Sequence, residues 1–350
     1  PIGPAERVRR LPPSRQQLPD RVPWKQGASL SVGEFLTGTA TRAFVVLHRG
    51  RLVEEWYGAA TEPSSRLASW SVAKSLVSLL TQQAIDEGKL LMSSRVVDVL
   101  PWLRVTDPSQ GDPGYNRITV RDLLDMTSGI DAPESYEADP TDPTFVTEIS
   151  GLATGTYQLL VTPDLRSYAR MHRQLVFTPG TRGEYISFNT QLLSMVVAKV
   201  LGQDLVTAFR ERLWEPAGAQ FRASWNLDRP GGTAKGFCCL NASARDFARL
   251  GLLIVEAGTK RSPVSRAWLD RLLTPRPRLV SGWPYSSSFW HIPGDQRGRR
   301  LADASAIGVF GQYIYVHPRT DTVIVKLSDY GIEQDEEATY RVFRAIARSW

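Results

Sequence analysis

Residues 69–75 read Ser69-Trp70-Ser71-Val72-Ala73-Lys74-Ser75 and open a long apolar segment of helical period. Because positions three apart share one face of a helix, Ser71 and Lys74 are predicted to meet at the start of a buried helix. A serine hydroxyl needs a neighbouring base to act as a nucleophile, and a lysine desolvated in an apolar pocket can be that base. The Ser71 backbone N–H, unpaired in the first turn, is a candidate oxyanion donor.

The pattern Ser-x-x-Lys is short, and the alternative is a capping serine followed by a solvated lysine. Two observations favour the catalytic interpretation. Lysine is scarce, with seven residues against 35 arginines, and Lys74 has apolar neighbours on both sides. A plain surface charge rarely has such surroundings. Both interpretations stay open on these four residues alone.

The composition indicates a globular protein. The chain has 350 residues, 42% of them hydrophobic and 22% charged, enough for two or more cooperative units. No apolar run reaches the ~18 residues that a membrane span needs. The chain starts at Pro1, so we expect the natural N-terminus to be missing, with any signal or anchor. Both a bacterial cytoplasmic and an exported location are compatible with this sequence.

Charge and cysteine placement argue against several partners. Residues 1–26 carry six basic and two acidic side chains of a chain whose net charge is +6, and they are rich in proline. We expect an extended, solvated basic arm on the surface and no nucleic-acid binding. The adjacent Cys238 and Cys239 are expected to remain unpaired. The scattered histidines lack metal-ligand spacing and no phosphate-binding glycine loop occurs, so no metal and no cofactor are predicted.

The order of predicted elements excludes an alternating parallel sheet. A β-hairpin comes first, then many helices, then a second hairpin and a last helix. The two hairpins are expected to join in one antiparallel sheet, with the helices in a separate lobe and Ser71 at the seam. The hairpins are predicted at 43–57 and 312–327, and the helices at 71–87, 93–100, 119–126, 165–175, 189–201, 203–214, 243–257 and 335–349.

Two further segments are candidates for the site. Residues 178–193 place Tyr185 on a loop after a Pro-Gly turn, just before an apolar helix. A phenol against a lysine ammonium can shuttle protons, although Tyr185 is equally compatible with a half-buried loop aromatic, and Ser187 or Asn189 with a helix cap. Residues 303–313 are small and glycine-rich, which lets a substrate carbonyl approach backbone N–H groups. An ordinary glycine-rich strand entrance is the alternative.

Taken together, the chain resembles the serine β-lactamase and penicillin-binding-protein superfamily, and within it the class C-like esterases and 6-aminohexanoate-dimer hydrolases. The resemblance rests on residues 69–75, 123–130, 185–193 and 308–316, with smaller echoes at 212–216 and 244–251. It implies an α+β fold of the β-lactamase/transpeptidase type, an antiparallel sheet flanked by helices plus a mostly helical lobe. We expect a basic arm at 1–26, an α/β lobe at 27–92 and 232–350, and a helical lobe at 93–231.

The resemblance also implies roles for individual residues. Ser71 is expected to be the nucleophile, with Lys74 and Tyr185 as its base partners. The oxyanion hole is expected to combine the Ser71 N–H with a backbone N–H of Ala306 or Ile307. Substrate contacts are expected from Ser187, Asp303, Gly308 and Trp290.

The sequence departs from β-lactamases at two places. They carry Lys-Thr/Ser-Gly on the strand before the glycine-rich segment, and counting back from Phe310-Gly311 places Asp303-Ala304-Ser305 there. The cation that would hold a β-lactam carboxylate is therefore expected to be replaced by an acid. Class C enzymes also carry Tyr-x-Asn, where this chain has Tyr185-Ile186-Ser187. Both changes argue against efficient antibiotic hydrolysis.

These observations predict a serine hydrolase of carboxylic esters or small linear amides that works through an acyl-enzyme on Ser71. A D,D-peptidase or weak β-lactamase is one alternative, and a non-catalytic penicillin-recognition-like binding protein is another. The expected partner is a small ester or amide, and the oligomeric state stays open. Pocket walls are expected from the loop 131–147 and from the aromatic stretch 283–290, which core packing explains equally well.

Overall fold

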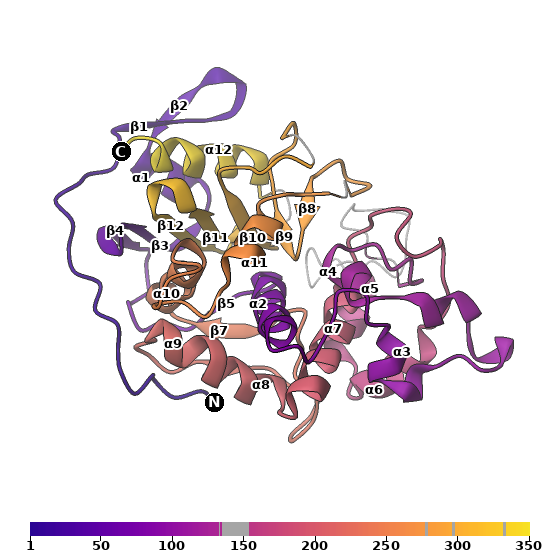
Figure 1. Ribbon diagram of the computed structural model, residues 1–350. Coiled ribbons are helices and arrows are strands. Elements are labelled where there is room, and N and C mark those ends of the chain that lie inside the picture. Colours follow the sequence, from indigo (N-terminus) through magenta and orange to yellow (C-terminus); the bar gives the residue numbers. More distant parts are fainter. Residues whose placement is uncertain (133, 135–153, 277–278, 296–297, 332–333) are drawn as a thin grey trace.

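A seven-stranded antiparallel sheet forms the centre of the larger part of the molecule (Figure 1). The computed structural model describes residues 1–350 except 133, 135–153, 277–278, 296–297 and 332–333. The strand order is β4-β3-β12-β11-β10-β9-β8. The strands are β3 (Thr41–His48), β4 (Arg51–Tyr57), β8 (Tyr285–Ser286), β9 (Phe289–Trp290), β10 (Ala304–Gly308), β11 (Gln312–His317) and β12 (Thr322–Ser328).

Both predicted hairpins are present, and they join as expected. Arg49 and Gly50 form the tight turn between β3 and β4, with φ of 50° and 70°. The second hairpin, β11 and β12, turns through a short 3-10 helix at Pro318–Thr320. Strand β12 then pairs along β3. The predicted antiparallel sheet, in which the first hairpin pairs with the second, is therefore confirmed.

Helices cover both faces of this sheet, because both faces are apolar. Along β3, Ala43, Val45 and Leu47 belong to one core, while Phe44 and Val46 belong to the other. This alternation is the period of two of a strand. The first core includes residues of α2 (Val72–Asp86) and α10 (Ala244–Val255), and the second includes residues of α1 (Val32–Gly38) and α12 (Glu336–Ala347). The short α11 (Arg266–Leu272) lies nearer the β8 edge (Figure 1).

Of the remaining helices, α3 to α7 gather on the other side of α2, while α8 and α9 lie at the bottom of the view, below α2 and α10 (Figure 1). Helix α4 begins with a capping box between Thr119 and Asp122. Helix α7 begins at Ser187, two residues earlier than predicted, because the Ser187 N–H finds an acceptor in the Glu134 carboxylate. These helices are α3 (Val96–Val99), α4 (Val120–Leu124), α5 (Thr154–Val161), α6 (Leu165–Met171), α7 (Ser187–Leu201), α8 (Leu205–Phe209) and α9 (Glu215–Ala217), with a π-helical turn at Arg210–Trp214 and 3-10 turns at Pro101–Leu103, Pro108–Gln110 and Pro113–Arg117.

None of the described helices is by itself long and apolar enough to cross a membrane. One bent pair, Ser187–Leu201 with Leu205–Ala217, meets the length and composition criteria together, with a bend of 79° between its members.

A small three-stranded sheet, which the sequence analysis did not predict, leads the chain into α2. Its order is β5-β7-β6, from β5 (Leu67–Ala68), β7 (Leu240–Ala242) and β6 (Ser224–Trp225). Beyond β5, the Ser69 N–H donates to the Leu240 carbonyl at 2.8 Å. Ser69, two residues before Ser71, is thereby fixed to a distant segment of the chain.

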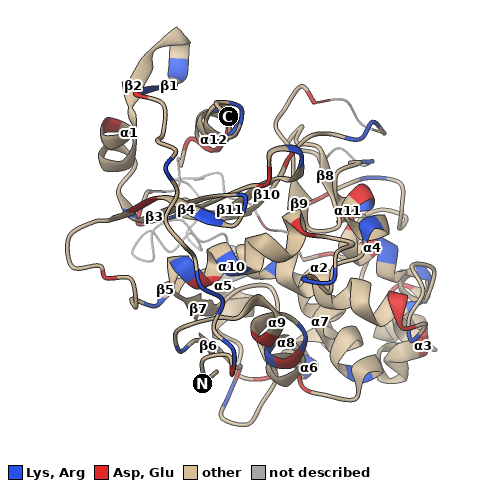
Figure 2. Cartoon of the chain, turned by 60° about the vertical axis from the view of Figure 1, so that its left-hand side comes forward, with Lys and Arg blue, Asp and Glu red and all other residues tan. Residues whose placement is uncertain are grey.

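The basic arm is fastened to the surface rather than merely solvated. It runs along the outside of the molecule from β1 to the N-terminus (Figure 2). Ile2 is buried and pairs with Ala223, and Arg9 forms an ion pair with Glu256 at 2.7 Å. The arm then enters a two-stranded ribbon, β1 (Arg21–Pro23) and β2 (Ser29–Ser31), around a 3-10 turn at Lys25–Gly27.

The expectation for the two cysteines is wrong. Cys238 and Cys239 are joined in a disulfide between sequence neighbours. Both side chains are buried directly before β7, close to the Phe237 carbonyl.

Candidate active site

Ser71 and Lys74 meet at the N-terminal end of α2. Ser71 precedes the first helical residue, and Lys74 follows one turn later on the same face. The Lys74 Nζ donates to Ser71 Oγ at 2.7 Å and to the Phe237 carbonyl at 3.0 Å. The lysine is only 1% exposed. It is therefore a buried amine in direct contact with the hydroxyl, and the solvated-lysine alternative does not fit this geometry.

Burial prepares Lys74 to act as a base. Loss of solvent lowers the pKa of its ammonium to about 8, while the negative charge of Glu134 acts in the opposite direction. A substantial fraction of the amine is therefore neutral near pH 8. A neutral amine at hydrogen-bond distance can accept the Ser71 proton.

Tyr185 lies against the same lysine. The Lys74 Nζ is 5.0 Å from the centre of the Tyr185 ring. The loop that carries the tyrosine is fixed by backbone bonds, from the Glu184 N–H to the Met126 carbonyl at 2.8 Å and from the Val280 N–H to the Gly183 carbonyl at 2.9 Å. Tyr185, which is far from Ser71 and Lys74 in the sequence, is thus brought next to both.

Trp290 belongs to the wall beside Tyr185. Their ring centres are 5.0 Å apart, and Tyr285 contacts both rings at 6.1 and 4.9 Å. Trp283 packs edge-on against Trp290 at 5.8 Å. The aromatic stretch expected to form a pocket wall therefore includes rings beside the Ser71–Lys74–Tyr185 cluster.

Gly308, at the end of β10, touches the backbone of the nucleophile turn. A Cβ placed on Gly308 would lie 2.6 Å from the Ser69 carbonyl oxygen and 3.0 Å from Ser71 N. Only glycine allows the strand to come this close. The Ser71 N–H makes no hydrogen bond within the described part of the chain, which leaves it available to a substrate oxygen.

This contact changes which residue is assigned as the second oxyanion donor. Ala306 and Ile307 lie within the ladder, opposite Ile314 and Tyr313 of β11. The strand meets Ser71 at Gly308, and the next residue, Val309, is outside the ladder. Its N–H has no acceptor among the described residues. The geometry therefore favours Val309 over Ala306 or Ile307.

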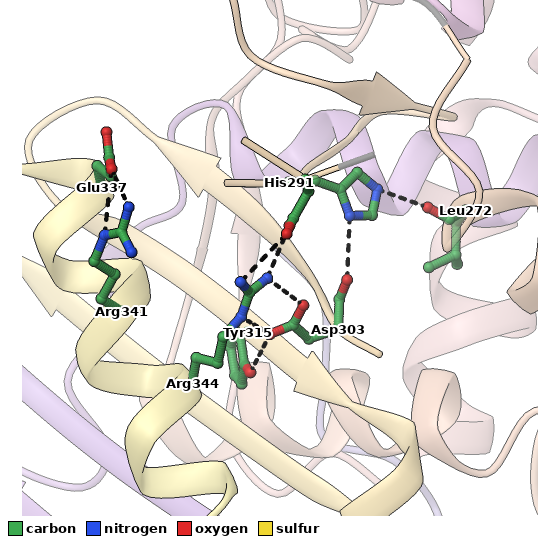
Figure 3. A network of polar contacts seen from close by, with 8 residues as sticks. Leu272, His291, Asp303, Tyr315, Glu337, Arg341 and Arg344 are labelled. Carbon is green, nitrogen blue, oxygen red and sulfur yellow. Dashed lines mark hydrogen bonds and ion pairs between the residues drawn. The ribbon is translucent and has the colours of Figure 1, made fainter. Parts of the chain in front are cut away.

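The structure does not bring Asp303 to the site. Its carboxylate accepts two hydrogen bonds from Arg344 of α12, both at 2.7 Å, and one from the Tyr315 hydroxyl at 2.7 Å (Figure 3). Burial acts to raise the pKa of Asp303, but the bonds from Arg344 outweigh it and hold the pKa below its usual value. Asp303 is a buried structural acid on the α12 side of the sheet.

The register expected for this strand is consequently wrong by three residues. Since Gly308 is the glycine at Ser71, the place of Lys-Thr-Gly is taken by Ala306-Ile307-Gly308. The position two residues before the glycine, on the same face, is a neutral alanine rather than an acid. As expected, no lysine occupies this place, but the acid expected there is absent as well.

Ser187 is buried at the start of α7 and contacts a residue that the sequence analysis did not name. Its Oγ donates to one oxygen of Glu134 at 2.8 Å, and its N–H donates to the other. Glu134 belongs to the loop 131–147 predicted to border a pocket, but residues 133 and 135–147 of that loop lie outside the described residues. The acid-rich composition of this loop is the only feature of the sequence that points to Glu134.

Phe237 is the second residue that sequence reasoning missed. Its carbonyl holds Lys74, and a backbone carbonyl has no signature in residue type. The segment before it is held by the Gln191 side chain, which accepts from the Gly236 N–H at 2.9 Å. Among the described residues, no cluster of three or more His, Cys, Asp or Glu is placed to hold a metal ion.

Comparison with known proteins decides the family. The β-lactamase family profile matches residues 32–347. The chain belongs to the β-lactamase family. It is 31% identical over 352 residues to the 6-aminohexanoate-dimer hydrolase of Paenarthrobacter ureafaciens, which covers 94% of this chain and 80% of that protein.

Solved structures agree on the fold. A Bacillus anthracis protein provisionally described as a 6-aminohexanoate-dimer hydrolase matches with a TM-score of 0.82 and 21% identity, over 99% of this chain and 89% of that chain. A class C β-lactamase from Rhodobacter sphaeroides matches with a TM-score of 0.60 and 17% identity, over 90% and 97%. The predicted β-lactamase/transpeptidase-like fold and the predicted class, a β-lactamase-related serine hydrolase, are confirmed.

Proposed function

We propose that this serine hydrolase cleaves carboxylic esters or small linear amides through an acyl-enzyme on Ser71. The observation that carries the proposal is the 2.7 Å contact between Ser71 Oγ and the buried Lys74 Nζ. As Ser71 Oγ attacks the substrate carbonyl carbon, its proton passes to the neutral Lys74. The N–H groups of Ser71 and Val309 would stabilise the negative charge on the carbonyl oxygen.

The second half of the reaction uses the same groups. Collapse of the tetrahedral intermediate breaks the bond to the alcohol or amine, which takes up a proton from the Lys74–Tyr185 pair. Water then attacks the ester on Ser71 and gives its proton to the same base, so that the acid leaves and the Ser71 hydroxyl is restored. No further cofactor is required by this sequence of steps.

The surroundings favour an uncharged, partly apolar acyl group. The wall beside Tyr185 consists of Trp290 and Tyr285, and the place of the β-lactamase strand lysine is taken by Ala306. Such a wall suits an aliphatic chain. A relative named as a 6-aminohexanoate-dimer hydrolase supports linear amides as one substrate class for this chain.

A D,D-peptidase or weak β-lactamase is the second candidate, and a relative named penicillin-binding protein 4, from Amycolatopsis lactamdurans, favours it. That relative is 30% identical over only 193 residues, 55% of this chain. The alanine at position 306 argues against it, since no cation stands there to hold a substrate carboxylate. A non-catalytic binding protein would have no need for a buried lysine against a serine.

Turnover of a substrate panel tests the proposal. The panel contains short-chain p-nitrophenyl esters, the 6-aminohexanoate dimer, a D-Ala-D-Ala peptide and nitrocefin, each with wild type and Ser71→Ala. We expect turnover of esters or of the linear amide that is lost in Ser71→Ala. Turnover of nitrocefin or of the peptide at rates matching the best ester would favour the second candidate. A wild-type protein that turns over none of them, and that no fluorophosphonate labels, would favour a binding protein.

A further inference from the structure

Two bulky residues beside the proposed oxyanion hole have left-handed backbones. Trp70 directly precedes Ser71 and has φ of 45°. Phe310 directly follows Val309 and has φ of 67°. Aromatic residues rarely adopt this conformation, and it persists only where the surrounding structure enforces it. Each of the two proposed N–H donors thus has one strained aromatic neighbour in the chain.

The two aromatic rings contact each other across the junction of α2 and the sheet. Their centres are 5.2 Å apart and their planes are inclined by 71°, an edge-to-face arrangement. The Trp70 Cβ would also lie 3.1 Å from a Cβ on Gly308. The ring pair therefore links the turn that carries one donor to the turn that carries the other.

Both turns are anchored to the rest of the fold on their other side. The Trp70 carbonyl accepts from the Ala73 N–H at 3.1 Å, within the first turn of α2. In the β10–β11 turn, the Gln312 side-chain amide donates to the Phe310 carbonyl at 3.0 Å and to the Ser328 carbonyl at 2.7 Å. The Tyr330 N–H also donates to the Phe310 carbonyl at 3.1 Å. These hydrogen bonds hold the carbonyl groups of both left-handed residues in place.

We propose that Trp70 and Phe310 are positioning residues, whose ring contact and left-handed backbones hold the Ser71 and Val309 N–H groups at the spacing that a tetrahedral oxyanion requires. This inference rests on the proposed function. The rings act through the two turns, and the oxyanion is touched by the N–H groups alone. Loss of either ring should therefore weaken the oxyanion interaction more than it weakens substrate binding.

Two substrates that differ in one atom can measure this weakening of the oxyanion interaction. p-Nitrophenyl acetate is compared with its thiono analogue, in which sulfur replaces the carbonyl oxygen and is a much poorer hydrogen-bond acceptor. We expect Trp70→Ala and Phe310→Ala to lower kcat for the oxygen ester by about 10- to 100-fold with little change in KM. The thiono ester should lose far less, so that the oxygen-to-sulfur rate ratio falls by about tenfold. Trp70→Phe and Phe310→Tyr keep a ring and should largely restore the ratio.

Controls separate this effect from general damage. Rates are divided by the fraction of protein that a fluorophosphonate titrates, which counts folded sites. Trp24→Ala removes one partner of a similar edge-to-face pair, Trp24 with Phe35 at 5.5 Å, away from Ser71, and should leave the ratio unchanged. If an alanine variant does not fold, Phe310→Leu, which keeps bulk without the aromatic ring, replaces it and should lower the ratio in the same direction.

An unchanged oxygen-to-sulfur ratio in the folded ring variants would overturn the inference, whether both substrates slow equally or neither slows. Failure of the proposed function gives a different result: the wild-type protein itself would then show no fluorophosphonate labelling and no ester turnover.

Discussion

Asp303 and Arg344 form a bidentate ion pair on the α12 side of the sheet, with both hydrogen bonds at 2.7 Å. Asp303 is 1% exposed. A carboxylate in this position serves the fold, since breaking a buried ion pair leaves an uncompensated charge. The pair also shows which residues of this segment face Ser71, because it places the side chain at position 303 on the opposite face of the sheet.

Asp303→Lys should therefore destabilise the protein without creating β-lactamase activity. The substitution places a second cation beside Arg344 in a buried site, and we expect a loss on the order of 3–5 kcal/mol in the free energy of unfolding. Thermal unfolding and nitrocefin hydrolysis measure the two parts. The matched control is Asp270→Lys, which breaks the exposed pair with Arg300 and should cost about 1 kcal/mol or less. A folded Asp303→Lys protein with increased nitrocefin turnover would show that Asp303-Ala304-Ser305, and not Ala306-Ile307-Gly308, takes the place of Lys-Thr-Gly.

The sequence predicted the parts of the site that depend on spacing, and missed those that depend on register. Ser71 and Lys74 are three residues apart on one helix, so their meeting follows from helical geometry. Counting back from Phe310-Gly311 places the residues of β10 three positions away from where the structure has them. An odd shift exchanges the two faces of a strand, which is why Asp303 was expected opposite the substrate.

Other contacts in the site cannot be predicted from the spacing of residues along the chain. The Phe237 carbonyl and the Glu134 carboxylate reach the site from segments 163 and 53 residues away from their partners Lys74 and Ser187. Such contacts are set by tertiary packing. The large sheet was predictable from its two hairpins, whereas the two- and three-residue strands β5 to β9 are too short to show a hydrophobic period.

The pH dependence of acylation should follow Lys74. Its pKa is lowered to about 8 by burial, so kcat/KM for an ester should rise with pH and level off above that value as the amine loses its proton. Glu134 favours the charged lysine. Glu134→Gln should therefore move the rising limb to lower pH, while Glu211→Gln, on the exposed surface, should not move it. A limb that stays in place in Glu134→Gln would show that another group titrates.

Gly308→Ala should reduce turnover while leaving the fold in place. Its Cβ would lie 2.6 Å from the Ser69 carbonyl and 3.0 Å from Ser71 N, so the strand must shift away from the nucleophile turn. We expect a loss of about 100-fold in kcat, the size seen when an oxyanion donor is removed. Gly33→Ala, which has no atom within 4 Å of the new Cβ, is the control. Full activity in Gly308→Ala would contradict the assignment of this strand to the oxyanion hole.

Lys326 offers a test of stability that is independent of catalysis. It is fully buried in β12, and its Nζ lies 5.7 to 5.8 Å from the ring centres of Phe35, Tyr313 and Tyr330. Burial lowers its pKa from 10.5 to about 7. Between these values the unfolded chain binds more protons than the native one, so Lys326 makes stability rise with pH across this window.

Lys326→Met should raise the free energy of unfolding at pH 7 by on the order of 1–3 kcal/mol and reduce its slope between pH 7 and 10. Chemical denaturation at several pH values measures both. Lys260→Met, at an exposed position, should change neither. A destabilised Lys326→Met protein would mean that the bonds of Lys326 to Ser328 and Thr39 outweigh its burial.

The acyl-enzyme itself tests the central claim most directly. Wild-type protein is mixed with a p-nitrophenyl ester, quenched in acid during the first turnover, and measured by intact mass and by peptide mapping. We predict a mass increase equal to one acyl group, carried by the peptide that contains Ser71, and no increase in Ser71→Ala. An acyl group on another residue, or steady ester turnover in a Ser71→Ala protein that forms no adduct, would contradict the account.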